Sequence, residues 1–262
     1  MNDTSENITV KLRHVNKRYR SRRGAAETTA LLDVNLEVRR GEIMSVIGPS
    51  GCGKSTMLRI IAGLDTDFTG EVQRFWKTER KKGLPDTGFV FQSPTLLPWR
   101  SVRKNIALGL EKAGLSRAET DARIGEMLEM TGLADFADSY PNQLSGGMQQ
   151  RVQIARALAY DPPVLLMDEP FGALDYITRE QLQEDLLKIW QSTEKTIILV
   201  THATDEAAYL SKRVCVLSSR PGTVKAVHTV PISYPRTIDV KAGADFAQFQ
   251  NLLREELKDE PK

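Results

Sequence analysis

A run of residues at positions 48–55 has the types and spacing of a loop that binds nucleotide phosphates, because its glycines lead into a lysine and a serine. Glycines let backbone N–H groups approach the phosphates, and the helix that follows adds the positive end of its dipole. We expect Lys54 to reach the phosphates and the Ser55 hydroxyl to ligate Mg²⁺. The expected nucleotide-binding residues are Gly48, Pro49, Ser50, Gly51, Cys52, Gly53, Lys54, Ser55 and Thr56.

Two acidic residues follow an apolar run at positions 164–167 that reads as a buried strand. A parallel strand brings the residues at its carboxyl end to the ligand-binding edge of a sheet. Asp168 can therefore hold Mg²⁺ directly or through water, and Glu169 can polarise the water that attacks the phosphate. Together with the phosphate loop, these acids predict ATP hydrolysis with ATP and Mg²⁺ as cofactors.

A second helix start suited to anions lies at Ser145, Gly146 and Gly147, where a capping hydroxyl and two glycines precede a helical pattern. One nucleotide does not need two such cradles from the same molecule. We therefore expect a dimer in which each copy offers this helix start to the γ-phosphate bound by its partner.

The elements that must position these residues are short apolar strands alternating with helices, which is typical of an α/β fold around a mostly parallel sheet. We expect strands at 43–47, 164–167, 197–200 and 214–217, and a helix at 54–62 that Gly63 ends. Residues 94–160 predict helices alone, so we expect an inserted helical subdomain. The predicted domains are an ATPase domain at 1–240 and a helical extension at 241–262.

Several helix signals support this division. Ser116 and Glu119 have the spacing of a capping box, and further helices are expected at 146–160 and 176–192. A last helix carries an apolar stripe that we expect to dock onto its own domain, formed by Phe246, Phe249, Leu253 and Leu257.

Composition restricts the functional classes. A net charge of +2 does not favour nucleic-acid binding, and the basic runs at 17–23 and 79–82 are expected to be solvated loops. Two cysteines suit a reducing compartment. No secretory signal is visible at residues 1–6, and the apolar runs are far shorter than the roughly 20 residues that span a bilayer. A soluble chain is expected, with any membrane role supplied by a partner.

From about residue 8 to about residue 234 the sequence resembles the ATP-binding cassette (ABC) ATPases, with every expected motif in order. Ser145, Gly146 and Gly147 are similar to the signature motif of that family, although Met148 stands where glutamine is commonest. The resemblance implies a P-loop NTPase core of the ABC type, in which a mostly parallel sheet is accompanied by an antiparallel β portion and an inserted helical subdomain.

The resemblance also implies residue roles. Gln92 resembles the glutamine that senses Mg²⁺ and water, and Asp175 resembles the aspartate of the loop that communicates across the dimer. His202 resembles the histidine that contacts the γ-phosphate, and Tyr19 the aromatic residue that stacks on adenine. The implied catalytic residues are Glu169, His202, Lys54 and Gln92, and the implied metal ligands are Ser55, Gln92 and Asp168.

The family further implies a second copy of the chain, two membrane-spanning permease subunits and, indirectly, a solute-binding protein. The chain would then lie at the cytoplasmic face of the inner membrane. In the family, the neighbourhood of Leu97, Pro98 and Trp99 receives the coupling helix of the membrane subunit. Packing of Leu97 and Trp99 inside the domain is the alternative.

Within the transporters, residues 97–99, 219–222 and 234–236 resemble the nitrate, sulfonate and taurine importers. Residues 73–86 depart from that group, which usually has a glycine-bearing hairpin there. Other small-solute importers, lipid exporters and ABC ATPases outside transport are the alternatives. A GTPase or nucleotide kinase is not favoured, because the chain lacks a guanine-reading motif. The cargo is not encoded in this chain.

Overall fold

The structure, a computed structural model, describes residues 7–20, 27–76 and 84–258. The first six residues, the basic residues at 21–23 and 79–82, and the middle of the unusual segment 73–86 lie outside these ranges. The chain forms two compact units, the first from Met1–Trp76 and Lys195–Lys262 and the second from Lys77–Glu194.

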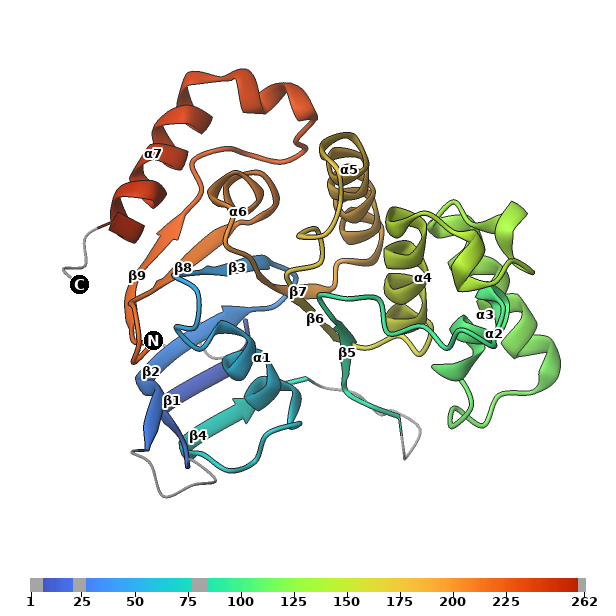
Figure 1. The fold of residues 1–262 in the computed structure, drawn as a ribbon, viewed down its shortest axis with the longest axis horizontal. Helices are drawn as coiled ribbons and strands as arrows, with labels where there is room; N and C mark the ends of the chain where they lie inside the picture. Colours follow the sequence, from blue (N-terminus) through green and yellow to red (C-terminus); the bar gives the residue numbers. More distant parts are fainter. Residues whose placement is uncertain (1–6, 21–26, 77–83, 259–262) are drawn as a thin grey trace. The chain divides into compact units, whose positions relative to one another are not determined.

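The first unit contains an antiparallel sheet with the strand order β2-β1-β4 (Figure 1). Its strands are β1 (Ile8–Tyr19), β2 (Thr28–Arg39) and β4 (Thr69–Arg74). Bulges interrupt the pairing of β1 and β2, and His14 and Asp33 both adopt a positive φ of 48° within it. The apolar side chains of β1, such as Val10 and Leu12, are buried.

A parallel group of strands forms the centre of the first unit. The fully buried strand β3 (Ile43–Ile47) pairs in parallel with both β7 (Thr196–Val200) and β8 (Arg213–Leu217), and β9 (Val224–Thr229) runs antiparallel to β8. These strands confirm the predictions at 43–47, 197–200 and 214–217.

The helices of the first unit also match their sequence signals. Helix α1 (Lys54–Ala62) ends at Gly63, whose φ of 74° makes it a left-handed stop. Helix α7 (Ala244–Lys258) lies alongside α6 (Thr204–Leu210) in Figure 1. Of the predicted stripe on α7, the buried side chains are Phe246, Phe249 and Leu253, whereas Leu257 is partly exposed.

The second unit combines a parallel pair of strands with helices. Strand β5 (Thr87–Val90) pairs with β6 (Val164–Asp168). The helices are α2 (Val102–Leu108), α3 (Arg117–Met130), α4 (Gly146–Leu158) and α5 (Tyr176–Thr193), with short 3₁₀ turns at Ala134–Phe136 and Pro141–Gln143. Residues 94–160, all of which the structure describes, contain helices and no strand, as predicted. The capping box of Ser116 and Glu119 is present at α3.

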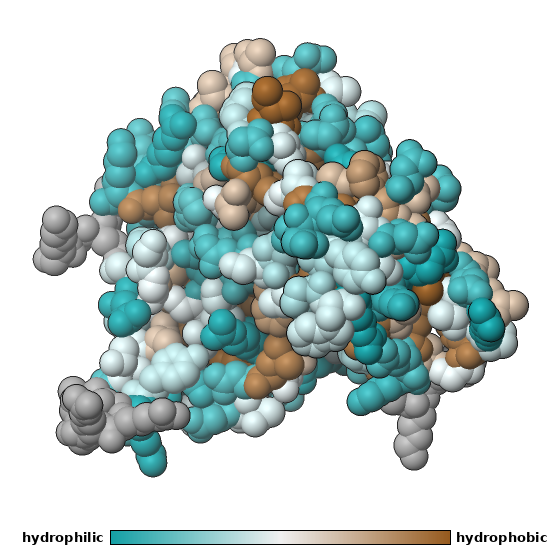
Figure 2. Space-filling model, turned by 45° about the vertical axis from the view of Figure 1, so that its right-hand side comes forward, coloured by the Kyte–Doolittle hydropathy of each residue, from teal (hydrophilic) through white to brown (hydrophobic). Residues whose placement is uncertain are grey.

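The surface shown in Figure 2 is largely hydrophilic, with hydrophobic side chains in separate small patches. Among the described residues, no helix has both the length and the apolar character that crossing a membrane requires.

Candidate functional site

The phosphate loop connects β3 to α1 in the first unit, and Gly53 occupies its tightest point. Gly53 has a φ of 103°, in the left-handed region that favours glycine. A Cβ at this position would lie 2.6 Å from Leu31 Cδ2 and 2.8 Å from the Ala30 carbonyl oxygen. Only glycine fits here, and the loop therefore presents backbone rather than side chains at the start of α1.

Lys54 is folded back over this loop. Its Nζ donates to the carbonyl oxygens of Gly48 at 2.8 Å and Pro49 at 3.0 Å, and the residue is only 5% exposed. A buried ammonium needs such partners because its desolvation is otherwise costly. Phosphate oxygens are stronger acceptors of its hydrogen bonds than these carbonyls. Lys54 is thus held where an entering phosphate can replace them.

Arg220 supports the same loop from outside. Its Nε donates to the Gly51 carbonyl oxygen at 3.0 Å, and the neighbouring Gly222 exchanges backbone hydrogen bonds with Ala30 and Leu32 at 3.0 Å each. The Gly51 peptide is held at its other end as well, since Cys52 N–H donates to Pro49. In the sequence, residues 219–222 stand out only through their resemblance to the importer group, and no local pattern predicts this contact with the phosphate loop.

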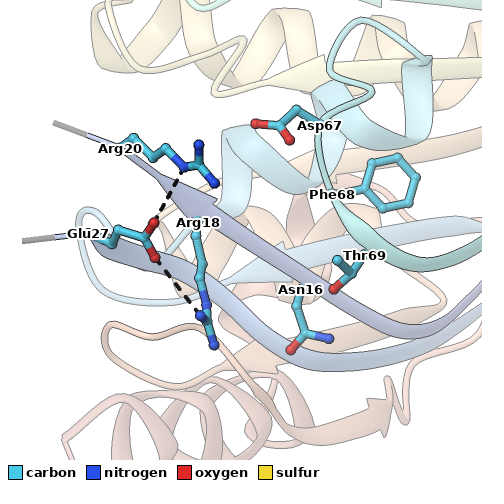
Figure 3. A pocket seen from close by; sticks show the side chains of 7 residues that line it. All are labelled: Asn16, Arg18, Arg20, Glu27, Asp67, Phe68 and Thr69. Carbon is cyan, nitrogen blue, oxygen red and sulfur yellow. Dashed lines mark ion pairs between the residues drawn. The ribbon is translucent and has the colours of Figure 1, made fainter. Parts of the chain in front are cut away.

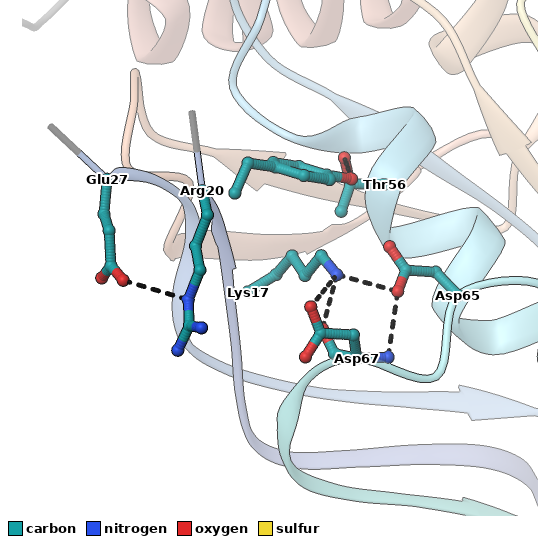
Figure 4. Close-up of polar contacts among 7 residues, drawn as sticks. Lys17, Arg20, Glu27, Thr56, Asp65 and Asp67 are labelled. Atoms are coloured by element: carbon teal, nitrogen blue, oxygen red, sulfur yellow. Dashed lines mark hydrogen bonds and ion pairs between the residues drawn. The ribbon is translucent and has the colours of Figure 1, made fainter. Parts of the chain in front are cut away.

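Tyr19 lies at the end of β1 and is 41% exposed. Its hydroxyl lies 3.1 Å from Thr56 Oγ1, on the residue that follows Ser55 in α1. Lys17 Nζ lies 4.9 Å from the centre of the Tyr19 ring. In Figure 4, Lys17 comes from β1 and Thr56 from α1, and the Lys17 ammonium points toward Asp65 and Asp67. The accessible ring at this place suits stacking on a base.

A hollow of about 700 Å³ lies around the neighbouring residues of β1 (Figure 3). Its lining includes Asn16 and Arg18 of β1 and Arg20, which directly follows the strand. Glu27 lies 3.9 Å from Arg18 NH1 and 3.4 Å from Arg20 Nε, so one carboxylate already serves both cations. No residue of the phosphate loop lines this hollow, so it is not the expected site of ATP hydrolysis.

His202 follows β7 at the same sheet edge as the phosphate loop. In the parallel pair, Val46 of β3 is registered with Val200 of β7. Gly48 and His202 each come two residues after these partners, where carboxyl ends of parallel strands gather ligand-binding groups. The His202 side chain is exposed. The first unit thus brings together Tyr19, the loop at 48–56 and His202.

The second unit has an equivalent edge. Val90 of β5 is registered with Met167 of β6, and Gln92 and Glu169 come two residues later. Gln92 Nε2 donates to Glu169 Oε2 at 3.2 Å, and Glu169 has a φ of 45°. Asp168, the last residue of β6, is buried. The Glu169 carboxylate and the Gln92 amide, both singled out in the sequence, are therefore in direct contact.

The start of α4 is built as the sequence predicts. Ser145 caps the helix, with Oγ accepting from the Met148 N–H at 3.3 Å, and Ser145 and Gly146 are exposed. Gly147 is buried, and a Cβ there would lie 2.2 Å from Thr178 Cγ2. This close approach requires glycine.

The same threonine, Thr178, belongs to the first turn of α5. Asp175 Oδ1 accepts from the Thr178 N–H at 3.0 Å and caps the helix. Hydrogen bonding by the side chain and the backbone N–H of Thr178 lowers the pKa of the Asp175 carboxyl below its usual value. Tyr176 and Ile177, which follow, are 69% and 78% exposed. Thr178 thus links the helix start at Ser145 to Asp175.

The loop after Gln92 is fixed by internal hydrogen bonds that sequence reasoning missed. Gln153 of α4 donates to the Phe91 carbonyl at 2.9 Å and accepts from Thr95, and Asn105 accepts from the Leu97 N–H at 2.8 Å. Trp99 is 71% exposed, so this side chain does not pack inside the domain.

Comparison with known proteins agrees with these motifs. The family described as "ABC transporter" matches residues 31–172. An uncharacterized ABC transporter ATP-binding protein of Methanocaldococcus jannaschii is 50% identical, over 88% of this chain and 85% of its own length. An aliphatic sulfonates import ATP-binding protein of Bacillus thuringiensis is 43% identical, over 96% of each chain.

Solved structures show the same fold. One is a dimeric, post-hydrolysis ATP-binding cassette bound to ADP and Pi, with 38% identity and a TM-score of 0.72 over 86% of this chain and all of that one. The predicted fold class and enzymatic class are thereby confirmed. The chain belongs to the ABC transporter family, of which it is an ATP-binding, ATP-hydrolysing subunit.

Proposed function

We propose that two copies of this chain close on two molecules of Mg-ATP and that hydrolysis releases them. The observation that carries this proposal is the pair of glycine-bearing helix starts, α1 after Gly53 and α4 after Ser145, each suited to an anion. Two similar cassettes of solved structure are dimeric. ATP held between two copies favours the closed dimer, so its cleavage drives opening.

Within this proposal, Glu169 positions the attacking water while Lys54 and His202 stabilise the charge that develops on the phosphoryl group. Ser145, Gly146, Gly147 and Asp175 of one copy serve the nucleotide of the other. Tyr19 stacks on the adenine. Such catalysis depends on position and electrostatics rather than on a covalent intermediate.

The proposed Mg²⁺ ligands are Ser55, Gln92 and Asp168, whose oxygen donors are those that Mg²⁺ prefers. The contact of Gln92 Nε2 with Glu169 leaves the Gln92 Oε1 atom as an acceptor, which is the donor type a cation needs. Bound Mg²⁺ would neutralise charge on the phosphates.

We further propose that ATP hydrolysis by this chain drives the import of a sulfonate-type solute. The support is the 43% identity to an aliphatic sulfonates import ATP-binding protein over nearly the whole chain. The proposed partners are two permease subunits, and through them a solute-binding protein, with the chain on the cytoplasmic face of the membrane. In domain terms, residues 1–240 form the ATPase domain, with its helical part at about 94–160, and residues 241–262 form an extension.

The Glu169→Gln variant tests the sandwich. We expect it to bind ATP, to lose turnover by a factor of about 100 or more, and to elute as a dimer with ATP on gel filtration. Glu129→Gln, on the exposed face of α3, is the matched control and should behave as the wild type. Normal turnover of Glu169→Gln would remove this residue from its role, and a monomer that hydrolyses ATP at full speed at any dilution would overturn the dimer.

Mixing experiments test whether the α4 start acts on the partner. Ser145→Arg should keep nucleotide binding and lose turnover, and it should inactivate wild-type copies with which it pairs. Activity that falls only in proportion to the mutant fraction would contradict an arrangement in trans.

Growth of the source organism tests the cargo. Deletion of the gene should abolish growth on an aliphatic sulfonate as the sole sulfur source, and wild type but not Glu169→Gln should restore it. Unchanged growth on sulfonates, with loss of growth on nitrate or another solute, would assign a different cargo to the same ATPase.

A further inference from the structure

Lys17 is a buried cation directly beside the proposed adenine site. It is 3% exposed, and its Nζ donates to Asp65 Oδ1 at 2.9 Å, to the Asp67 carbonyl at 2.5 Å and to Asp67 Oδ2 at 3.3 Å (Figure 4). Burial alone lowers the pKa of this ammonium, but the hydrogen bonds and charges of the two aspartates raise it above its usual value. Lys17 is therefore charged and fixed in one place.

The fixed ammonium faces an aromatic ring. Lys17 and Tyr19 are two residues apart in β1, and their side chains meet on one side of the strand. The Lys17 Nζ atom lies 4.9 Å from the centre of the Tyr19 ring, within the range of a cation–π contact. The Tyr19 hydroxyl is held separately at Thr56 Oγ1. The ring thus has one contact on its face and another at its edge, and it remains 41% exposed.

We propose that Lys17 is a positioning residue for the base of the nucleotide: anchored by Asp65 and Asp67, it fixes the Tyr19 ring in the orientation that stacks on adenine. A ring fixed before binding loses less conformational entropy when the base arrives. The loop at 65–67, which follows α1, thereby contributes to affinity without touching the ligand. This inference rests on the stacking role proposed for Tyr19.

Binding of ADP and of pyrophosphate separates the base from the phosphates, and neither probe is hydrolysed. Wild-type protein should bind ADP more tightly than pyrophosphate, and Tyr19→Ala should remove most of that difference. Lys17→Met should weaken ADP binding by about three- to tenfold and leave pyrophosphate within about twofold. In the Tyr19→Ala background, Lys17→Met should have no further effect on ADP.

The matched control is Lys11→Met, which removes another ion-paired lysine of β1, the partner of Glu37. Its ADP and pyrophosphate affinities should equal those of the wild type. Lys17→Gln, which keeps a donor but loses the charge, serves as the second variant should Lys17→Met fail to fold. It should also weaken ADP selectively.

The possible results distinguish the positioning role of Lys17 from the stacking role of Tyr19 on which it rests. Equal losses for ADP and pyrophosphate, or no loss for either, would reduce Lys17 to a structural tie and overturn the inference, while Tyr19→Ala still weakens ADP. If Tyr19→Ala itself leaves ADP binding unchanged, the proposed stacking role fails and the inference with it.

Discussion

The side-chain amide of Gln92 donates a hydrogen bond to the carboxylate of Glu169 across 3.2 Å. The two residues are 77 positions apart in sequence. The parallel register of Val90 with Met167 brings them together, because each follows its strand partner by two residues. The Glu169 Oε2 atom thus accepts a hydrogen bond from an amide, and this contact can orient the carboxylate in the role proposed for it.

Replacement of Gln92 by alanine should lower kcat more than it raises KM. A hydrogen bond to a charged group contributes about 1.5–3 kcal/mol, so its loss corresponds to a decrease in kcat of about 10- to 150-fold if it orients the catalytic carboxylate. Steady-state ATP hydrolysis by the purified protein measures both constants.

Gln181→Ala is the matched control, since Gln181 also donates to a carboxylate in the second unit, that of Asp185 at 3.1 Å. It should leave kcat unchanged. A Gln92→Ala enzyme with wild-type kcat would show that the amide does not act through Glu169.

Because Gly147 lies so close to Thr178, we expect substitution of this glycine to lower the stability of the protein. Gly147→Ala should destabilise the protein by about 1–3 kcal/mol, because the new Cβ would lie 2.2 Å from Thr178 Cγ2. Adding Thr178→Ser removes that methyl group, so the double variant should recover most of the loss, helped by the better helix propensity of alanine. Urea unfolding of the wild type, both single variants and the double variant gives the coupling energy. Equal instability of Gly147→Ala with and without Thr178→Ser would place the strain elsewhere.

Local signals in the sequence predict the phosphate loop, the helix caps and the buried strands because each depends on residues that are neighbours in the chain. Strands β1 and β2 are not predicted by their own pattern. Their bulges, with His14 and Asp33 at positive φ, break the alternation of buried and exposed residues.

Side chains that support the site from far away in the sequence are equally invisible. Lys17 finds its acceptors 48 and 50 residues away, and Arg220 finds Gly51 at a separation of 169. A basic residue in a polar stretch is usually a solvated surface residue. Only the folded contacts distinguish the buried Lys17 from its exposed neighbours, and Arg220, which is itself exposed, from other surface arginines.

Stability at alkaline pH should depend on Cys215. Burial raises the pKa of this thiol to about 12, whereas an unfolded cysteine titrates at about 8.5. Between these values the unfolded chain has released the proton and the folded protein has not. The contribution of Cys215 to the free energy of unfolding is therefore fully present below about pH 8.5 and is lost as the pH rises. The slope from this single group is about 1.4 kcal/mol per pH unit.

Cys215→Val should remove that slope. The free energies of unfolding of the wild type and the variant can be compared by urea unfolding between pH 8 and about pH 10. Above this range the buried Tyr234 phenol, whose pKa is raised to about 12, adds its own effect. Parallel stability curves for wild type and variant over this range would mean that Cys215 reaches solvent in the folded state.

The contact of Arg220 with Gly51 predicts a phosphate-specific loss of affinity. The Gly51 peptide is held by Arg220 Nε at its carbonyl and by Pro49 at the following N–H, so the loop is ordered before a nucleotide binds. Arg220→Met removes one of these restraints, and the loop must then be ordered at the cost of binding energy. ADP and pyrophosphate should both bind about three- to tenfold more weakly, in contrast to the base-selective effect expected of Lys17→Met.

Arg40→Met is the control, because Arg40 also donates to a backbone carbonyl, that of Phe75 at 3.4 Å. Unchanged pyrophosphate binding by Arg220→Met would show that the loop holds its shape without this arginine.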